Sequence, residues 1–222
     1  MGSGRDFRLL VFDWDGTLMD SEARIVSAMQ TAIAEAKLPP PSNRQIRNII
    51  GLGLDDAIRQ LYPETEAHIR DHLAERYRVH FRHANSVSTP LFPGARETLH
   101  RLHVTGYLLA VATGKSRRGL NRAFEETGVG PLFHASQCAD EACSKPHPQM
   151  LEAIMDKLGV DTRDTLVIGD SEYDLQMANN VGTACLAVSY GVQSPEHLLK
   201  YKPLDLLEDI VALPEWLIRI KA

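Results

Sequence analysis

The spacing of apolar residues changes along the chain and divides it into parts. Residues 9–12 form an unbroken apolar run, which is typical of a strand buried on both faces of a parallel sheet. Between residues 21 and 87, apolar residues recur every three or four positions, which predicts an all-helical segment. Prolines and glycines interrupt this segment, and the predicted helices span residues 21–37, 42–50, 54–62 and 64–84.

Two features of these helices bear on how they pack. Ser21 stands where a serine side chain caps the free backbone amides at the start of a helix. The last helix carries one apolar stripe, which we interpret as a packing face because residues four apart lie on the same side of a helix. The stripe consists of Ile69, Leu73, Tyr77 and Phe81.

From residue 94 onward, helices alternate with short apolar strands, and a linker is predicted before them at residues 86–93. Such alternation predicts a parallel sheet with helices on both faces. We therefore predict an α/β protein with a doubly wound, Rossmann-like core and an inserted all-helical cap domain. The predicted core comprises residues 1–20 and 88–222, and the predicted cap comprises residues 21–87. The predicted core strands are 7–13, 107–113, 133–137, 165–169 and 184–189, and the helices are 95–104, 116–128, 148–158 and 171–180.

Composition narrows the classes of partner. Among 222 residues, 44% are hydrophobic and 24% are charged, as in an ordinary globular protein, and the net charge of −5 gives no basic surface for nucleic acid. No apolar run is long enough to cross a membrane, and no signal-peptide pattern is present. Three cysteines are too few and too irregular for a disulfide framework. We expect a cytoplasmic monomer with no nucleic-acid or membrane partner.

Two aspartates follow the first strand. Asp13 and Asp15 are separated by one residue, so on an extended backbone both carboxylates point to the same side, beyond the carboxyl end of the strand. Ligands bind at that end in open α/β sheets, and two adjacent carboxylates with oxygen ligands favour a magnesium ion. Gly16 allows the chain to turn sharply away. The alternative is an ordinary strand end with solvated acids.

Three later segments also carry candidate chemistry. Thr113-Gly114 follows a strand and could hold phosphate on a hydroxyl and free backbone amides, or could be an ordinary helix cap. Asp170 follows another apolar strand, as Asp13 does, although an aspartate at this point could also cap a helix. Lys145 precedes a predicted helix, where it could neutralise phosphate or lie solvated on the surface.

In this order the four segments resemble the motifs of the haloacid dehalogenase (HAD) superfamily. The motifs are D-x-D-G-T, T-G-K, K-P and G-D-x-x-x-D, and the resemblance covers nearly the whole chain. The helical insertion is similar to the small cap of the phosphoglycolate-phosphatase-like branch, called a C1-type cap. Trp14, between the two acids, is bulkier than the aliphatic residue usual in the family. Because alternation turns it to the opposite face, we interpret it as packing.

The resemblance implies a role for each matching residue. It makes Asp13 the nucleophile and Asp15 the general acid and base, with Thr113 and Lys145 holding the phosphate and neutralising its charge. It implies a magnesium site formed by Asp13, the backbone carbonyl of Asp15 and Asp170. The resemblance also implies that Asp174 orients the metal ligands or Lys145.

The resemblance also places a substrate-specificity loop at residues 50–54 of the cap. This loop is expected to close over the leaving group, although it could equally be a helix break that serves only cap packing. Arg47 and Arg59 lie nearby and could contact a substrate carboxylate or be solvated. The residues expected to contact substrate are Thr17, Gly114, Gly51 and Gly53.

These features together predict a Mg²⁺-dependent phosphatase of this family, acting on a small phosphorylated metabolite through an aspartyl-phosphate intermediate. The substrate would be phosphoglycolate-like or a sugar phosphate. The first alternative is a phosphotransferase or sugar phosphomutase, which is disfavoured because Ile25 stands where related mutases usually carry histidine. The second is a non-catalytic binding module, which would be expected to lose Asp13, Asp15 or Asp170.

Overall fold

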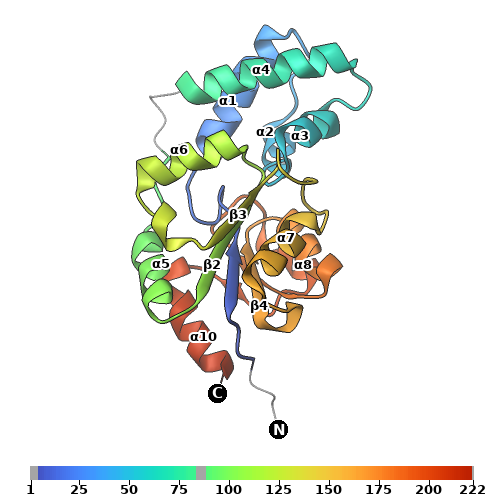
Figure 1. Ribbon diagram of the computed structural model, residues 1–222. Coiled ribbons are helices and arrows are strands. Elements are labelled where there is room, and N and C mark those ends of the chain that lie inside the picture. Colours follow the sequence, from blue (N-terminus) through green and yellow to red (C-terminus); the bar gives the residue numbers. More distant parts are fainter. Residues whose placement is uncertain (1–4, 84–88, 222) are drawn as a thin grey trace.

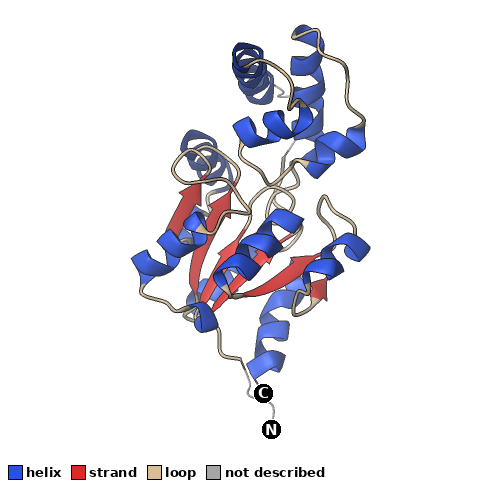
Figure 2. Cartoon of the chain, turned by 90° about the vertical axis from the view of Figure 1, so that its right-hand side faces the viewer, coloured by secondary structure: helices blue, strands red, loops and turns tan. Residues whose placement is uncertain are grey.

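The computed structural model of the chain describes residues 5–83 and 89–221. The strands form one parallel sheet (Figure 2), in which six strands have the order β3-β2-β1-β4-β5-β6, with β1 near the middle. The predicted α/β class and inserted helices are confirmed. The linker prediction lies partly outside the described residues, because residues 86–88 are not among them. The strands are β1 (Leu9–Phe12), β2 (Leu108–Thr113), β3 (Ala135–Cys138), β4 (Thr165–Gly169), β5 (Ala184–Val188) and β6 (Leu206–Leu207).

Helices cover both faces of the sheet (Figure 1). Strand β1 contributes side chains to both layers. Leu10 and Phe12 pack with the helices on one face, whereas Leu9 and Val11 pack with those on the other. This explains why the run is apolar at every position rather than at alternate ones. The first layer contains α5 (Ala95–Val104), α6 (Arg117–Thr127) and α10 (Leu213–Lys221), and the second contains α7 (Gln149–Leu158) and α8 (Glu172–Val181).

Helices α1 to α4 form a separate group at the opposite end of the molecule from both termini (Figure 1). They surround an apolar cluster of their own that includes Met29, Ile46, Ile58 and Leu73. The second helix begins with a capping box, in which Ser42 accepts from the backbone amide of Gln45, as its sequence favours. We call this group the cap helices; they are α1 (Glu22–Glu35), α2 (Asn43–Asn48), α3 (Leu54–Leu61) and α4 (Ala67–His83).

The elements after residue 189 were not predicted. The short helix α9 (Pro195–Leu198) and the two-residue strand β6 are too brief to give a periodic pattern. Helix α10 begins with proline in its first turn and buries Trp216 and Leu217 against the first layer. Across residues 5–83 and 89–221, no helix is both long and apolar enough to span a membrane.

Candidate active site

The candidate site lies at the carboxyl ends of the three central strands. The chain runs from β1 to β2 and β3 on one side, then crosses back to β4 on the other side of β1, so the strand order reverses beside β1. Such a switch point is where open α/β sheets bind ligands. The backbone amide of Asp13 donates to the carbonyl of Ile168 at 2.9 Å, so the residue after β1 is fixed beside the end of β4.

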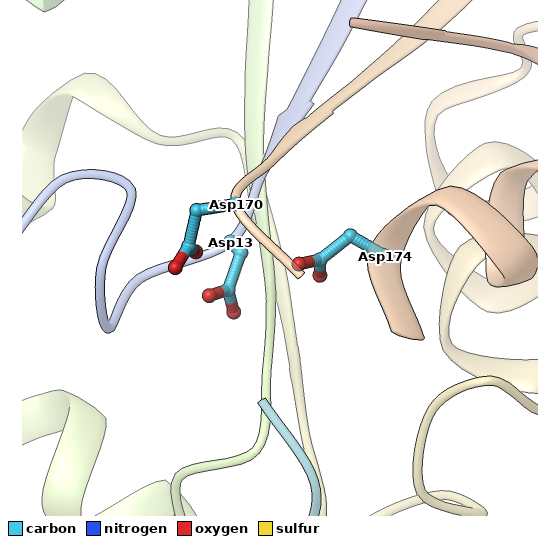
Figure 3. A group of neighbouring side chains, drawn as sticks. All are labelled: Asp13, Asp170 and Asp174. Atoms are coloured by element: carbon cyan, nitrogen blue, oxygen red, sulfur yellow. The ribbon is translucent and has the colours of Figure 1, made fainter. Parts of the chain in front are cut away.

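Three buried aspartates converge at this point (Figure 3). Asp13 follows β1, Asp170 follows β4, and Asp174 reaches in from the first turn of α8. One carboxylate oxygen from each residue lies within 4.8 Å of those of the other two. The helix cap beside them is Ser171, so the alternative interpretation of Asp170 as an N-cap is wrong.

Lys145 joins two of these aspartates. Its Nζ donates to Asp13 Oδ1 and to Asp174 Oδ1, at 2.6 Å each, and its side chain is fully buried. Burial raises the pKa of Asp13 well above its ordinary value, and Lys145 opposes that rise. Burial alone would lower the pKa of Lys145, but the charges of Asp13 and Asp174 outweigh it and hold the ammonium charged. The alternative of a solvated surface lysine is therefore wrong.

Asp170 is held by contacts on both oxygens. Thr17 Oγ1 donates to Oδ1 and the backbone amide of Val192 donates to Oδ2, at 2.8 Å each. A Cβ at Gly16, where φ is +90°, would lie 2.2 Å from Oδ2, so only glycine leaves room for this carboxylate. Burial, with the charge of Asp174 adding to it, raises the pKa of Asp170 to about 7.

The aspartates and Lys145 fit a divalent cation. With every group ionised, the three carboxylates and one ammonium carry two net negative charges, a charge that a divalent cation balances. Asp13 Oδ2 is buried and has no hydrogen-bond partner among the described residues, whereas Lys145 and Ser171 occupy the two oxygens of Asp174. An ion at this point could be shared by Asp13 and Asp170, whose oxygens lie within 4.8 Å of each other, and Asp174, which holds Lys145, is suited to orient that lysine.

Asp15 points away from the aspartate cluster. Its Oδ1 accepts a short hydrogen bond from Ser21 and lies 2.9 Å from Lys115 Nζ. Ser21 begins α1 as predicted, but its hydroxyl does not cap that helix and instead binds Asp15. Lys115 was not among the predicted site residues, although it belongs to the T-G-K motif.

The predicted phosphate and substrate residues divide into two groups. Thr113 and Thr17 are fully buried: the hydroxyl of Thr113 accepts from the backbone amide of Lys115 at 3.2 Å, and that of Thr17 is engaged by Asp170. The glycines instead lie on the contact between cap and core. A Cβ at Gly114 would lie 2.3 Å from the carbonyl oxygen of Leu52, and the backbone amide of Gly53 donates to Ser144 Oγ at 2.7 Å.

A cavity of about 680 Å³ separates the cap helices from the strand ends. Asp13 and Asp15 line it from the core, and the predicted specificity loop lines it from the cap. Tyr77 and Phe81 pack against buried apolar residues, as predicted for the α4 stripe, and they also line the cavity. Helical spacing identified the face of α4 but could not distinguish a core from a cavity. Trp14 is fully buried and packs edge-on against Phe124, which confirms its assignment to the core.

The family model described as haloacid dehalogenase-like hydrolase matches residues 10–188, which include the three strand ends and the cap helices. The chain belongs to the haloacid dehalogenase-like hydrolases. It is 34% identical over 221 residues to "Probable phosphatase IndB" of Dickeya dadantii, covering 96% of each chain. It is 31% identical over 214 residues to the phosphoglycolate phosphatase of Pseudomonas syringae pv. tomato, covering 94% of this chain and 79% of the relative.

Solved structures of HAD-like hydrolases share the fold. A hydrolase from Pseudomonas syringae superposes with a TM-score of 0.88, at 22% identity, over 97% of this chain and all of the other. This likeness extends through the cap helices as well as the sheet. The chain is thus an enzyme of the HAD-like family, and its relatives include named phosphatases.

Proposed function

We propose that this HAD-like phosphatase hydrolyses the phosphate monoester of a small metabolite, either a phosphoglycolate-like acid or a sugar phosphate, through an aspartyl-phosphate intermediate. The observation that carries the proposal is the arrangement of Asp13. One carboxylate oxygen is held by Lys145, and the other is buried and free of hydrogen bonds among the described residues. Lys145 and a bound divalent cation would favour ionised Asp13 against the effect of its burial, and an ionised carboxylate is a nucleophile that needs no base to deprotonate it.

The proposed reaction has two steps. Asp13 Oδ2 attacks phosphorus while the bond to the ester oxygen breaks, and the leaving alkoxide takes a proton from Asp15. Asp15 then accepts a proton from the water that attacks the aspartyl-phosphate, which releases inorganic phosphate and regenerates Asp13. Lys145 offsets negative charge on the transferring group.

Asp13, Asp170 and the backbone carbonyl of Asp15 would hold Mg²⁺. When bound, the ion neutralises charge on the phosphoryl oxygens. The two net negative charges of the aspartate cluster support this assignment, as does the approach of one oxygen from each aspartate to within 4.8 Å of the others. Asp174 would keep Lys145 directed at Asp13 through the 2.6 Å contact.

Cavity size and relatives support a small substrate. A volume of about 680 Å³ lies within the range of sites that bind small molecules. The relatives named phosphoglycolate phosphatase support a short phosphorylated acid as one candidate. A phosphomutase is less well supported, because Ile25 packs with Ile50 and Val192 and gives no polar group for a second proton transfer.

The test combines a chemical trap with a variant. Wild-type protein and Asp13→Asn are assayed for phosphate release from p-nitrophenyl phosphate and a metabolite panel, with Mg²⁺ and with chelator. Turnover is expected to need Mg²⁺ and to fall at least about 10⁴-fold in Asp13→Asn, because the covalent step is lost. Acetyl phosphate should label wild-type Asp13 and leave Asp13→Asn unlabelled. Near-normal turnover in a purified, folded Asp13→Asn protein would contradict the proposal.

A further inference from the structure

Arg24, on the first turn of α1, is a buried cation that lines the cavity. Only 9% of the residue is exposed. Its Nε and Nη2 both donate to one backbone carbonyl, that of Phe81 near the end of α4, at 2.9 and 2.7 Å. Across residues 5–83 and 89–221 it forms no ion pair with a carboxylate, and residues 84–88 include no Asp or Glu.

A buried charge without a counter-charge is unfavourable, so its position calls for an explanation. A guanidinium has five N–H donors, and the Phe81 carbonyl engages two of them. The remaining three have no acceptor among the described residues. Holding the C-terminal carbonyl of a helix would explain the first two contacts but not the buried, unbalanced charge.

Three other arginines that line this cavity differ from Arg24 because a carboxylate balances their charge. Each of Arg59, Arg78 and Arg122 forms an ion pair with a carboxylate of its own surface. Arg82 and Arg118 have no such partner among the described residues, but Arg118 is exposed and Arg82 is only half-buried, so both keep more hydration than Arg24. Arg47 is paired with Glu22 at 2.9 Å and does not line the cavity.

Arg24 lies at the end of the cavity that contains Asp15. The Cζ of Arg24 and the Nζ of Lys115 lie 4.9 and 5.0 Å from the centre of the Phe81 ring, so one aromatic side chain contacts a cation of the cap and a cation of the core. Lys115 is balanced by Asp15, at 2.9 Å. Arg24 and Lys115 therefore place two cationic groups around Asp15, the proposed acid and base.

We propose that Arg24 binds a carboxylate on the leaving group, which makes short phosphorylated acids the preferred substrate class. The free N–H groups on Nη1 and Nη2 match the two oxygens of a carboxylate. This inference rests on the proposed phosphatase activity, since it concerns the leaving group of that reaction.

The test compares matched pairs of esters that differ only in the carboxylate. The pairs are 2-phosphoglycolate with 2-hydroxyethyl phosphate, and 3-phosphoglycerate with glycerol 1-phosphate; acetyl phosphate reports the phosphoryl chemistry alone. Wild-type protein is expected to prefer the acid in at least one pair. Arg24→Gln should lower kcat/KM for that acid about 10- to 100-fold, mainly through KM, as for loss of a hydrogen bond to a charged group. For the matching ester without a carboxylate, and for acetyl phosphate, kcat/KM should change less than about threefold.

Arg118→Gln is the matched control, because it removes an arginine from the wall of the same cavity and should leave the acid preference unchanged. If Arg24→Gln fails to fold, Arg24→Lys carries the test: a reduced ratio of acid to alcohol turnover supports the inference, and an unchanged ratio overturns it. Equal losses of kcat/KM on the acid and on its partner without a carboxylate, in Arg24→Gln, also overturn it. A wild-type preference for the ester without a carboxylate does so as well. Absence of turnover on every ester and on acetyl phosphate would instead contradict the phosphatase proposal.

Discussion

The two sides of the cavity differ in how their charges are satisfied. On the core side, Lys145 has two carboxylate partners at 2.6 Å and Asp170 has a donor on each oxygen, so these groups are fixed before any substrate arrives. On the cap side, the one hydrogen-bond partner of Arg24 among the described residues is a carbonyl, which leaves three of its N–H donors free there. We infer that the residues at the strand ends perform the reaction and that the cap helices select the leaving group.

The largest expected effect comes from removing the charge at the centre of the core side. Lys145→Met would leave Asp13 and Asp174 buried without their shared cation. We expect a loss of about 3–5 kcal/mol of unfolding free energy and a fall in turnover of at least about 10³-fold. The loss of stability should be greater at pH 8 than at pH 5, because protonation of the carboxylates relieves their repulsion. Urea unfolding at both pH values measures it.

Lys221→Met is the control for that change. Its ammonium pairs with Asp6 on the surface, where both side chains are substantially exposed, so its removal should alter stability by less than about 1 kcal/mol. If Lys145→Met also lowers the free energy of unfolding by less than about 1 kcal/mol, the buried contacts of Lys145 with Asp13 and Asp174 do not hold the core side rigidly.

The contrast between the core side and the cap side also explains which site residues could be predicted from the sequence. Asp13 and Asp170 were predicted because each directly follows an apolar strand, and parallel strands bring their carboxyl ends together. The bond between Lys145 and Asp13 depends on the path of the chain between two distant segments, and no local pattern specifies it. The resemblance to a known family supplied the role of Lys145.

Residues on the cap side were harder to predict. The spacing of Tyr77 and Phe81 is correct for a helix face, but the same spacing serves a core face and a cavity wall. Arg24 lies among the apolar positions of α1, where a single arginine is normally read as solvated. The function of Ser21 was missed for a different reason, since a helix-start serine has a local explanation as a cap, whereas its hydroxyl binds Asp15.

A second, intermediate effect concerns pH and metal binding. Because burial raises the pKa of Asp170 to about 7, a proton competes with Mg²⁺ for this carboxylate at lower pH. The apparent Kd for Mg²⁺ should fall about tenfold per unit as pH rises toward 7 and then level off. In metal-free protein, the raised pKa of Asp170 means that protonation of this carboxyl favours the folded state. The stability that the protonated carboxyl contributes is therefore lost as pH rises from 3.8 to about 7.

Calorimetric titration of Mg²⁺ at several pH values measures the effect. Titrations in buffers with different ionisation enthalpies count the protons released. Asp170→Asn is the matched variant, and it should bind Mg²⁺ weakly with little dependence on pH over this range. A wild-type Kd that does not vary between pH 5.5 and 7 would show that Asp170 is already ionised and that its surroundings are more polar than its burial indicates.

The smallest expected effect tests whether the cap loop selects the leaving group. Gly51 has φ +107°, which a β-branched residue does not adopt without strain, and an added Cβ would lie 2.8 Å from Ser171 Oγ. Gly51→Val should therefore displace the loop and raise KM for the natural substrate about tenfold, while hydrolysis of acetyl phosphate changes less than about threefold.

Two features make the result of Gly51→Val interpretable. Gly159→Val is a matched control, because Gly159 also has positive φ (+63°) but has no atom within 4 Å of an added Cβ and lies outside the cavity lining. It should reproduce the cost in stability without the change in KM. Ser171 also donates to Asp174 at 2.6 Å, so a valine at position 51 could disturb Lys145 through this serine. Comparable losses on both substrates would indicate that route, and the cap loop would then act on the chemistry rather than on the choice of leaving group.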